Sequence, residues 1–569
     1  MTSLYVQVEA ACAAAFASVL DGSDPIVRTS DHADFQANGA MGIAKSLGRN
    51  PREVAQEAAE ELAANPLFSS VEVAGPGFIN LEVAPEAVLK GLEAMGTSET
   101  LGIETAATPK TVVIDYSSPN VAKEMHVGHL RSTVIGDALC RLFELTGNRV
   151  IRRNHVGDWG TPFGMLIEHL LDLGEKSAVS ELGMGDLDGF YRQARAKFEA
   201  SDAFKERSRQ RVVLLQGGDE ETLRLWRVLV AESIRYFDTV YRALDVGMQE
   251  ADVRGESFYN DQLDTVVSDL EAKGLIQYSG GAACVFPPGF TNRDGEPLPV
   301  IVRKSDEGYG YAATDLAAIR DRIEVLGADL MLYVVGAPQA QHFEMIFSVA
   351  KMAGWLNEPV EAVHVSFGNV LGPDRKMFKT RSGETVKLKT LLDEGIERAR
   401  AALAQRGERD DIDHVANQVA MGAIKYADLA TDRQRDYVFD WDRMLAFEGN
   451  TGPYLQYAHA RIRSIFRRVE DGTEPGAILL NEPQERALAM ALLELPEVIA
   501  STIETYSPSK LCTYLFDLAQ TFTTFYEFCP VLKADEVAIR ASRLSLCELT
   551  ASTLRLGLSA LGIEAPEQM

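Results

Sequence analysis

One stretch of the chain, residues 117–133, constrains the fold more than any other. It reads S-S-P-N-V-A-K-E-M-H-V-G-H-L-R-S-T and places His126 and His129 around Gly128. An apolar run of β-branched residues, V-V-I, comes shortly before it, as is typical of a buried parallel strand. After it, apolar residues recur at helical spacing until Gly147, a residue that commonly ends a helix. Because a second apolar run follows, the stretch predicts a β-loop-α-β unit.

Such a unit places the two histidines where α/β proteins bind their ligands. The carboxyl edge of a parallel sheet carries the ligand site, and a helix N-terminus there favours an anion such as phosphate. Gly128 lets a flat ligand approach the backbone, and His126 and His129 are able to donate hydrogen bonds to phosphate oxygens. The alternative is a histidine pair that only caps the helix or lies hydrogen-bonded in a core.

The whole stretch argues against that alternative because it resembles a known family. H-V-G-H resembles the H-I-G-H element of class I aminoacyl-tRNA synthetases, and the longer run resembles its arginyl-tRNA synthetase form. The resemblance implies an α/β fold: a Rossmann-like catalytic core with an N-terminal α+β domain and a C-terminal all-α helical-bundle domain. It also implies that the histidine pair and Gly128 bind ATP, with both histidines catalytic.

Length and composition fit a large protein with several cores. At 569 residues and 46% hydrophobic, three or four domains are the natural expectation. No apolar run approaches the length of a membrane span, and the N-terminus lacks a signal-peptide pattern, so we expect a soluble cytoplasmic protein. The six cysteines are far apart without a C-x-x-C pair, which argues against zinc knuckles and disulfides.

The net charge of −27 argues against a general nucleic-acid binder, which is normally basic. A tRNA enzyme is compatible with this charge if its basic residues gather on one face. Candidate clusters are Arg152–Arg153, Arg461 with Arg463, and Arg467–Arg468. Each is equally compatible with a solvated helix edge, so charge alone does not indicate this function.

The chain divides into three predicted domains. Residues 1–100 indicate a small α+β domain, with helices at 10–20 and 51–64 and a two-stranded hairpin. Two runs in this domain, D-F-Q-A-N-G-A-M and G-P-G-F-I-N, resemble the N-terminal extension of arginyl-tRNA synthetases, and the resemblance implies contact with tRNA. Residues 101–405 indicate the catalytic core, with a mostly helical insertion at about 175–290. Residues 406–569 have a helical pattern with few strand signals, and the resemblance implies that they form the anticodon-binding domain.

The second half of the core resembles the family's amino-acid pocket. R-K-S-D-E-G-Y-G-Y-A-A-T-D ends at Asp315, which shares a predicted helical face with Tyr311 four residues earlier. An apolar strand then leads to G-A-P-Q-A-Q-H. The resemblance assigns arginine binding to six residues: Asp115, Ser118, Asn120, Tyr311, Asp315 and Gln339, the last in preference to Gln341. A guanidinium carries five donors, so carboxylates and an aromatic wall suit it. For Asp315 alone, an ordinary helix N-cap is the alternative.

Residues 376–383 read K-M-F-K-T-R-S-G and resemble the K-M-S-K-S loop, which we call the lysine loop (374–383 with its lead-in). The third and fifth positions depart from the family pattern, so Lys379 is the firmer match and the role of Lys376 is less defined. Both are predicted to bind ATP and act in catalysis, with Lys123 assisting. Holding phosphates and neutralising charge as pyrophosphate leaves suits lysines on a mobile loop. Alone, K-x-x-K is usually a solvated turn.

Two further runs match the family. N-H-V-G-D-W-G-T-P-F-G, from residue 154, is interpreted mainly as scaffold behind the histidines. F-E-G-N-T-G-P-Y-L-Q-Y-A-H-A-R-I, from residue 447, resembles the entry to the anticodon-binding domain. Tyr454, Tyr457 and Arg461 are candidate tRNA contacts, because aromatic rings stack on splayed bases. The alternative for Tyr454 is packing between helices.

These features together predict a monomeric arginine–tRNA ligase of bacterial type. Its expected partners are ATP, L-arginine and the cognate tRNA, with Mg²⁺ accompanying ATP and neither zinc, an organic cofactor, a membrane nor DNA. Two alternatives remain open. One is a class I ligase for another amino acid, and the other is a tRNA-binding paralogue without catalysis, against which His126, His129 and Lys379 argue.

Overall fold

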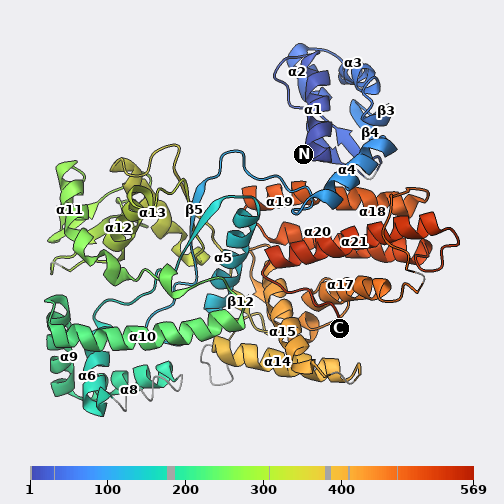
Figure 1. Cartoon of the computed structure of the whole chain (residues 1–569). Coiled ribbons are helices and arrows are strands. Elements are labelled where there is room, and N and C mark those ends of the chain that lie inside the picture. Colours follow the sequence, from blue (N-terminus) through green and yellow to red (C-terminus); the bar gives the residue numbers. More distant parts are fainter. Residues whose placement is uncertain are drawn as a thin grey trace.

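The computed structural model describes residues 3–30, 32–175, 186–306, 308–378, 386–407, 410–470 and 472–569. The chain forms an N-terminal lobe, a central parallel sheet with a largely helical insertion, and a C-terminal set of helices (Figure 1).

The N-terminal lobe is an α+β unit, as predicted. Its elements are α1 (Leu4–Ala17), β1 (Val27–Thr29), β2 (Phe35–Ala37), α2 (Ala40–Leu47), α3 (Pro51–Ala63), β3 (Phe68–Ala74), β4 (Phe78–Val83) and α4 (Pro85–Thr97). The strands form an antiparallel sheet in the order β1-β2-β4-β3. The predicted hairpin and the helix with Pro51 at its start are confirmed. Helix α1 begins earlier than predicted because the Ser3 side chain caps it by accepting the Val6 N–H.

Four parallel strands form the central sheet in the order β11-β10-β5-β6. They are β5 (Thr111–Asp115), β6 (Arg149–Arg153), β10 (Leu330–Tyr333) and β11 (Glu361–His364), and α5 (Val127–Leu145), α12 (Tyr311–Glu324), η3 (Ala337–Gln339) and α13 (Ala340–Met352) accompany them. Val112 and Ile114 pack with α5, whereas Val113 packs with α12 and α13 on the other face. The predicted β-loop-α-β unit is confirmed. The chain leaves β5 toward β6 and returns through β10 on its other side, so the ligand crevice is expected between β5 and β10.

The predicted insertion is mostly helical. Helix α6 (Pro162–Leu173) lies just before it. The insertion contains α8 (Leu187–Ala200), α9 (Asp202–Gln216), α10 (Glu220–Ala243), η1 (Glu250–Asp252), η2 (Glu256–Gln262) and α11 (Leu263–Ala272). A small antiparallel sheet of β7 (Gln277–Ser279), β8 (Ala282–Val285) and β9 (Val300–Arg303) follows. This sheet was not predicted, because its strands are only three or four residues long.

The C-terminal part is helical, as predicted. It contains α15 (Ile412–Leu429), α16 (Trp441–Met444), α17 (Gly452–Phe466), α18 (Pro483–Leu493), α19 (Leu495–Glu504), α20 (Ser509–Phe528) and α21 (Val537–Ala560). Helix α14 (Leu388–Ala404), at the end of the predicted core, packs against α15. Two short parallel strands, β12 (Val370–Leu371) and β13 (Tyr437–Val438), connect the C-terminal part to the core. Among the described residues, no helix is both long and apolar enough to cross a membrane.

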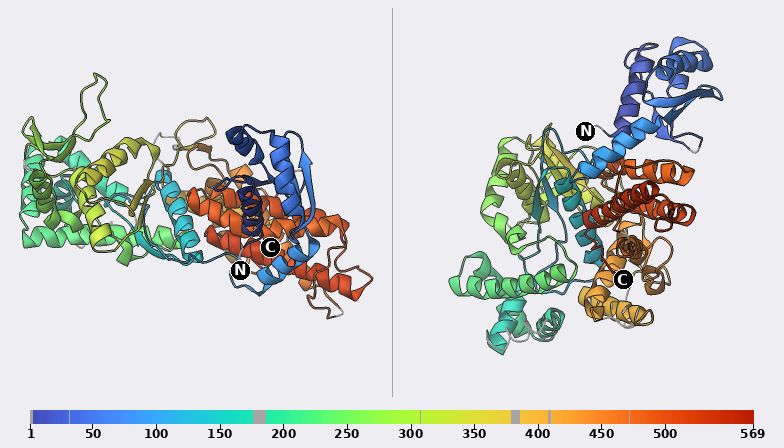
Figure 2. Two further views of the ribbon diagram at one scale, coloured as in Figure 1. Left: turned by 90° about the horizontal axis from the view of Figure 1, so that it is seen from above. Right: turned by 45° about the vertical axis from the view of Figure 1, so that its right-hand side comes forward.

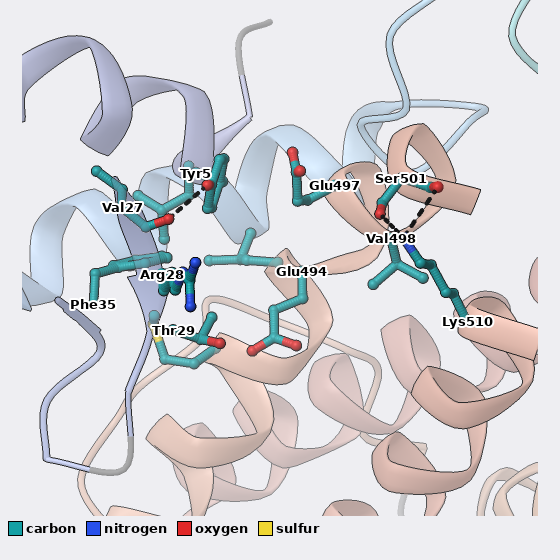
Figure 3. Close-up of a pocket in the computed structure, with 13 residues that line it drawn as sticks. Tyr5, Val27, Arg28, Thr29, Phe35, Glu494, Glu497, Val498, Ser501 and Lys510 are labelled. Carbon is teal, nitrogen blue, oxygen red and sulfur yellow. Dashed lines mark hydrogen bonds between the residues drawn. The ribbon is translucent and has the colours of Figure 1, made fainter. Parts of the chain in front are cut away.

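Helix α4 of the N-terminal lobe packs against α18, and the lobe also borders α19 (Figure 2). Arg486 of α18 forms an ion pair with Asp34 at 2.5 Å and donates to the Val83 carbonyl at 3.0 Å. Beside this contact lies a cavity of about 450 Å³ with an apolar floor, which the carboxylates of Glu494 and Glu497 border (Figure 3). The cavity is lined by residues of the N-terminal lobe and of the C-terminal helices, and it contains no predicted site residue.

Candidate active site

The two histidines lie at the start of helix α5, at the carboxyl end of strand β5. His126 is the N-cap of the helix, and its Nδ1 accepts the Gly128 N–H at 3.1 Å. Nδ1 of His129 accepts the His126 N–H at 3.1 Å, and the two ring centroids are 4.0 Å apart. The histidines therefore do cap the helix, as the simpler interpretation holds, but each uses only one ring nitrogen to do so.

This arrangement sets the charge and the tautomer of both rings. Burial lowers the pKa of His126, and burial together with the neighbouring His126 lowers the pKa of His129 to about 3. Both rings are therefore neutral near pH 7. Since each Nδ1 accepts a backbone N–H, the ring proton is on Nε2. The pair thus presents two neutral N–H donors beside a helix N-terminus, an arrangement that suits a phosphate.

Gly128 and the loop before the helix are sterically constrained. A Cβ atom at Gly128 would lie 2.8 Å from Cε1 of His126, closer than atoms approach without displacement. Ser117, Ser118 and Ala122 adopt φ angles of 73°, 46° and 60°, in the left-handed region that L residues rarely occupy. Such backbone strain concentrates at functional sites.

Strand β5 ends at Asp115, and its carboxylate already has a cationic partner. Oδ2 lies 2.5 Å from Nη2 of Arg322, a residue of α12 whose guanidinium also lies 4.7 Å from the Tyr333 ring centroid. Both charged side chains are buried. Oδ1 accepts weaker hydrogen bonds from the Ser118 hydroxyl at 3.3 Å and the His155 N–H at 3.4 Å. Arg322 was not predicted from the sequence, and it offsets the negative charge expected of this position.

Tyr311 and Asp315 both lie on helix α12, as their spacing predicted. Tyr311 is 74% exposed in the first turn of the helix, so its ring is available to a ligand. Asp315 is interior to the helix and Gly310 is the N-cap, so the alternative of Asp315 as an ordinary N-cap is wrong. Oδ2 of Asp315 lies 2.7 Å from Nε2 of His342, which fixes the carboxylate. The predicted Gln339 is exposed at the end of η3.

The sequence interpretation missed a third carboxylate, Glu256. It opens the 3-10 helix η2, and Asp158 fixes this turn by accepting the Ser257 N–H at 2.9 Å and its hydroxyl at 2.6 Å. Burial, Asp158 and Asp315 raise the pKa of Glu256 to about 8. The interpretation of the G-D-W-G run as scaffold is consistent with this contact. No local pattern marks Glu256, because it lies in the insertion far from the other motifs.

Ser118 and Asn120 lie in the loop after β5, beside the segment that begins at residue 154. The Ser118 N–H donates to Oδ1 of Asn154 at 3.0 Å, and Asn120 forms a parallel bridge with Gly157. The Asn120 side chain is exposed and lies next to Gly157, where an added Cβ would meet its Oδ1 at 2.4 Å. The backbone of both residues is thus held near the carboxyl end of β5.

The predicted lysines differ in how the structure describes them. Lys379 lies outside the described residues, which resume at residue 386. Lys376 is exposed on a turn that the Gly372 N–H closes onto its carbonyl at 2.7 Å. Lys123 is exposed, with Nζ 4.7 Å from the Tyr191 ring centroid. Phe378 occupies the position where the K-M-S-K-S pattern has serine. Its ring stacks on that of Phe439 at a centroid distance of 4.9 Å, which fixes the first part of the lysine loop.

The chain directly after the lysine loop, residues 386–388, is bonded to residues 124–127 at the start of α5. Lys387 lies 2.7 Å from Oε1 of Glu124. The Val127 N–H donates to the Val386 carbonyl at 3.0 Å, and the Leu388 N–H donates to the Met125 carbonyl at 2.9 Å. Residues 386–388, which follow the lysine loop in the chain, are thus bonded to residues 124–127, the segment that contains His126. No sequence signal separated Lys387 from other surface lysines.

Comparison with known proteins identifies the family. Residues 93–441 match the family model described as tRNA synthetases class I (R), catalytic domain, residues 3–83 match the arginyl tRNA synthetase N terminal domain, and residues 455–569 match the DALR anticodon binding domain. A protein of Thermobifida fusca named arginine–tRNA ligase is 53% identical over 100% of this chain and 99% of its own length. The chain belongs to the arginyl-tRNA synthetases.

Other arginyl-tRNA synthetases agree with this assignment. The arginine–tRNA ligase of Saccharophagus degradans is 50% identical, with 94% of each chain covered. The crystal structure of the Plasmodium falciparum arginyl-tRNA synthetase superposes with a TM-score of 0.87 at 31% identity over the full length of both chains. The Thermus thermophilus arginyl-tRNA synthetase, at 24% identity and a TM-score of 0.83, shows the shared fold.

The predicted tRNA contacts all lie on helix α17, in the segment that resembles the arginyl-tRNA synthetase element. Tyr454 is partly buried, with its ring centroid 5.7 Å from that of Phe516, so it packs between helices as the simpler interpretation holds. Tyr457 is exposed and lies under the guanidinium of Arg406. Arg461 is exposed, 5.1 Å from the Tyr526 ring centroid.

Proposed function

We propose that the chain is an arginine–tRNA ligase. It activates arginine with MgATP to form arginyl-adenylate and transfers arginine to the 2′-hydroxyl of the terminal adenosine of its tRNA. The observation that carries this proposal is the neutral histidine pair at the start of α5, at the carboxyl end of β5, bonded to the segment that follows the lysine loop. Family membership over the whole chain supports it.

In the first step, the arginine carboxylate attacks the α-phosphorus of ATP. The new bond joins a carboxylate oxygen to that phosphorus, and the bond to the β-phosphate bridging oxygen breaks to release pyrophosphate. Nε2–H of His126 and His129 donate to the phosphates as charge develops, and Lys376, Lys379 and Lys123 neutralise the departing pyrophosphate. Mg²⁺ enters with ATP, since substrate phosphates are its usual ligands. No side chain acts as a nucleophile, so positioning and electrostatics supply the rate.

In the second step, the tRNA hydroxyl attacks the carbonyl carbon of the adenylate. The ester bond forms there, the mixed anhydride bond breaks to release AMP, and the proton of the hydroxyl passes to the phosphate oxygen of the departing AMP. Ser118 and Asn120, held beside the end of β5, bind the α-amino and carboxylate groups and keep this carbonyl in place through both steps.

For the guanidinium, Asp315 and Glu256 supply most of the attraction. His342 orients the Asp315 carboxylate, and a cation beside Glu256 favours its ionised form. Tyr311 and Gln339 complete the wall of the pocket. Asp115 contributes through Oδ1, while Arg322 occupies its other oxygen and reduces its net attraction.

We also propose the division of labour among domains. Residues 1–100 contact tRNA, residues 101–405 carry the catalytic core with the insertion at 175–290, and residues 406–569 bind the anticodon. Of the candidate tRNA contacts, Tyr457 and Arg461 are exposed and therefore better placed than the partly buried Tyr454. The matched segments 3–83, 93–441 and 455–569 support this order. The enzyme acts as a monomer in the cytoplasm, where its three substrates are found.

Arginine-dependent ATP–pyrophosphate exchange, with and without cognate tRNA, tests the function. Exchange with arginine and not with other amino acids supports the proposal, and its dependence on tRNA shows whether the two substrates are coupled. Stronger exchange with another amino acid would favour a ligase of different specificity. Binding of tRNA without exchange in either condition would favour an inactive paralogue.

A further inference from the structure

Arg131 is a fully buried arginine on helix α5, two residues after His129, and has no role in the chemistry above. Its side chain is 1% exposed, and Nε lies 3.2 Å from Oδ1 of Asp428, which is itself fully buried on α15. Nη1 donates to the Arg435 carbonyl at 2.9 Å. The guanidinium lies 5.8 Å and 5.3 Å from the ring centroids of Phe367 and Tyr437. We call these five residues the Arg131 junction.

The Arg131 junction joins segments that are far apart in the sequence. Phe367 precedes β12, which leads into the lysine loop, and Tyr437 belongs to β13, which pairs with β12. Arg433, in the segment between α15 and β13, donates to the Ser366 carbonyl at 2.7 Å. Helix α15 packs in turn against α14 and α17. The histidine helix, the near end of the lysine loop and the C-terminal helices therefore meet at one guanidinium.

A buried ion pair at this position is a costly way to hold helices together. Replacing such a pair by packed apolar residues is often neutral or stabilising, so stability alone does not account for it. An ion pair with a further hydrogen bond to a carbonyl is directional, and it fixes an angle and a distance that apolar contact leaves adjustable. Because Arg131 lies within one turn of His129 on a rigid helix, any shift at the junction moves the histidines.

We propose that Arg131 and Asp428 are positioning residues for adenylate formation. Their ion pair sets the orientation in which α5 presents His126 and His129, and it couples that orientation to the near end of the lysine loop and to the C-terminal helices. This role rests on the proposed function, because it assumes that the two histidines bind the phosphates of ATP.

A matched pair of variants separates positioning from stability. Asp428→Asn removes the negative charge of the junction with little change of shape and leaves the Arg131 guanidinium without its ionic partner. Glu485→Gln is the control, because Glu485 is also buried and pairs at 2.7 Å with Arg543, which likewise donates to a carbonyl, that of Pro530, at 2.8 Å. That second pair joins α18 to α21 and has no role in the site. Arg131→Lys is the fallback if Asp428→Asn does not fold.

Thermal unfolding by circular dichroism should show a lowered Tm for both variants. At a temperature where both are folded, kcat of arginine-dependent exchange at saturating substrates should fall about 10²-fold in Asp428→Asn, the loss expected from a displacement of about 1 Å. KM for arginine should stay within about twofold, and Glu485→Gln should keep the wild-type kcat. Equal kcat per folded molecule in the two variants would overturn the proposal.

A second readout does not depend on activity. In protein labelled with ¹⁵N-histidine, the Nε2 signals of His126 and His129 should shift in Asp428→Asn and stay in place in Glu485→Gln. Unmoved signals in Asp428→Asn would overturn the positioning role even if kcat fell. Wild-type protein without exchange activity would instead refute the proposed function, and a shift of the signals would still support the junction.

Discussion

Replacing Gly128 by alanine should separate the stability of the protein from its activity. Gly128 lies in the first turn of α5, where its N–H donates to Nδ1 of His126. The added Cβ would lie 2.8 Å from Cε1 and 2.9 Å from Nδ1 of that ring. Since the helix backbone is fixed by packing, the imidazole must rotate away, and its Nε2–H then leaves the phosphate site.

The expected effects on stability nearly cancel. Alanine is favoured over glycine inside a helix by about 1 kcal/mol, less near its end. The lost hydrogen bond costs about 1 kcal/mol, so the free energy of unfolding should change by less than about 1 kcal/mol. Catalysis has no such compensation. Removing one donor aimed at developing charge typically lowers kcat by about 10²- to 10³-fold.

Gly42→Ala is the matched control. Gly42 lies within helix α2, and an added Cβ there meets nothing within 4 Å. Urea unfolding and arginine-dependent ATP–pyrophosphate exchange would be measured for both variants. Gly42→Ala should keep the wild-type kcat. A Gly128→Ala enzyme with wild-type kcat would refute the geometry of the histidine pair, and a large loss of stability in that variant would refute the steric argument.

Three further predictions concern the pocket and the histidines. Because the pKa of Glu256 is raised to about 8, its carboxyl is largely protonated near pH 7 and ionises as pH rises. The value of kcat/KM for arginine should therefore increase from about pH 7 to about pH 9. Glu256→Gln should flatten this rise. A flat wild-type profile would contradict the role of Glu256. Asp315→Asn should raise KM for arginine about 10²-fold with little change in Tm. Asp115→Asn instead leaves buried Arg322 without its partner and should lower the free energy of unfolding by about 3–5 kcal/mol. Equal Tm values for the two variants would disprove this contrast. Finally, with its pKa lowered to about 3, His129 should remain neutral in an NMR titration from about pH 7 to about pH 5, and titration near its ordinary pKa would show that the ring is not buried as described.

Much of the fold follows from local patterns in the sequence. The strand–histidine–helix unit was predictable because its apolar spacing, its helix start and its terminal glycine all lie within about 40 residues, where local propensities decide structure. The helical C-terminal part and the N-terminal hairpin were predictable for the same reason. The shared face of Tyr311 and Asp315 needed only the period of a helix.

The sequence by itself determined which residue types are available to the site and which of them lie at strand and helix ends. Only the tertiary structure decided their electrostatic state. Asp115 and Asp315 look alike in the sequence, yet Arg322 pairs with the first, and His342 and Glu256 surround the second. Likewise, Lys387 and Phe378 gain their roles from contacts with Glu124 and Phe439. Burial and pairing depend on elements far apart in the chain meeting in space, and no local pattern records such meetings.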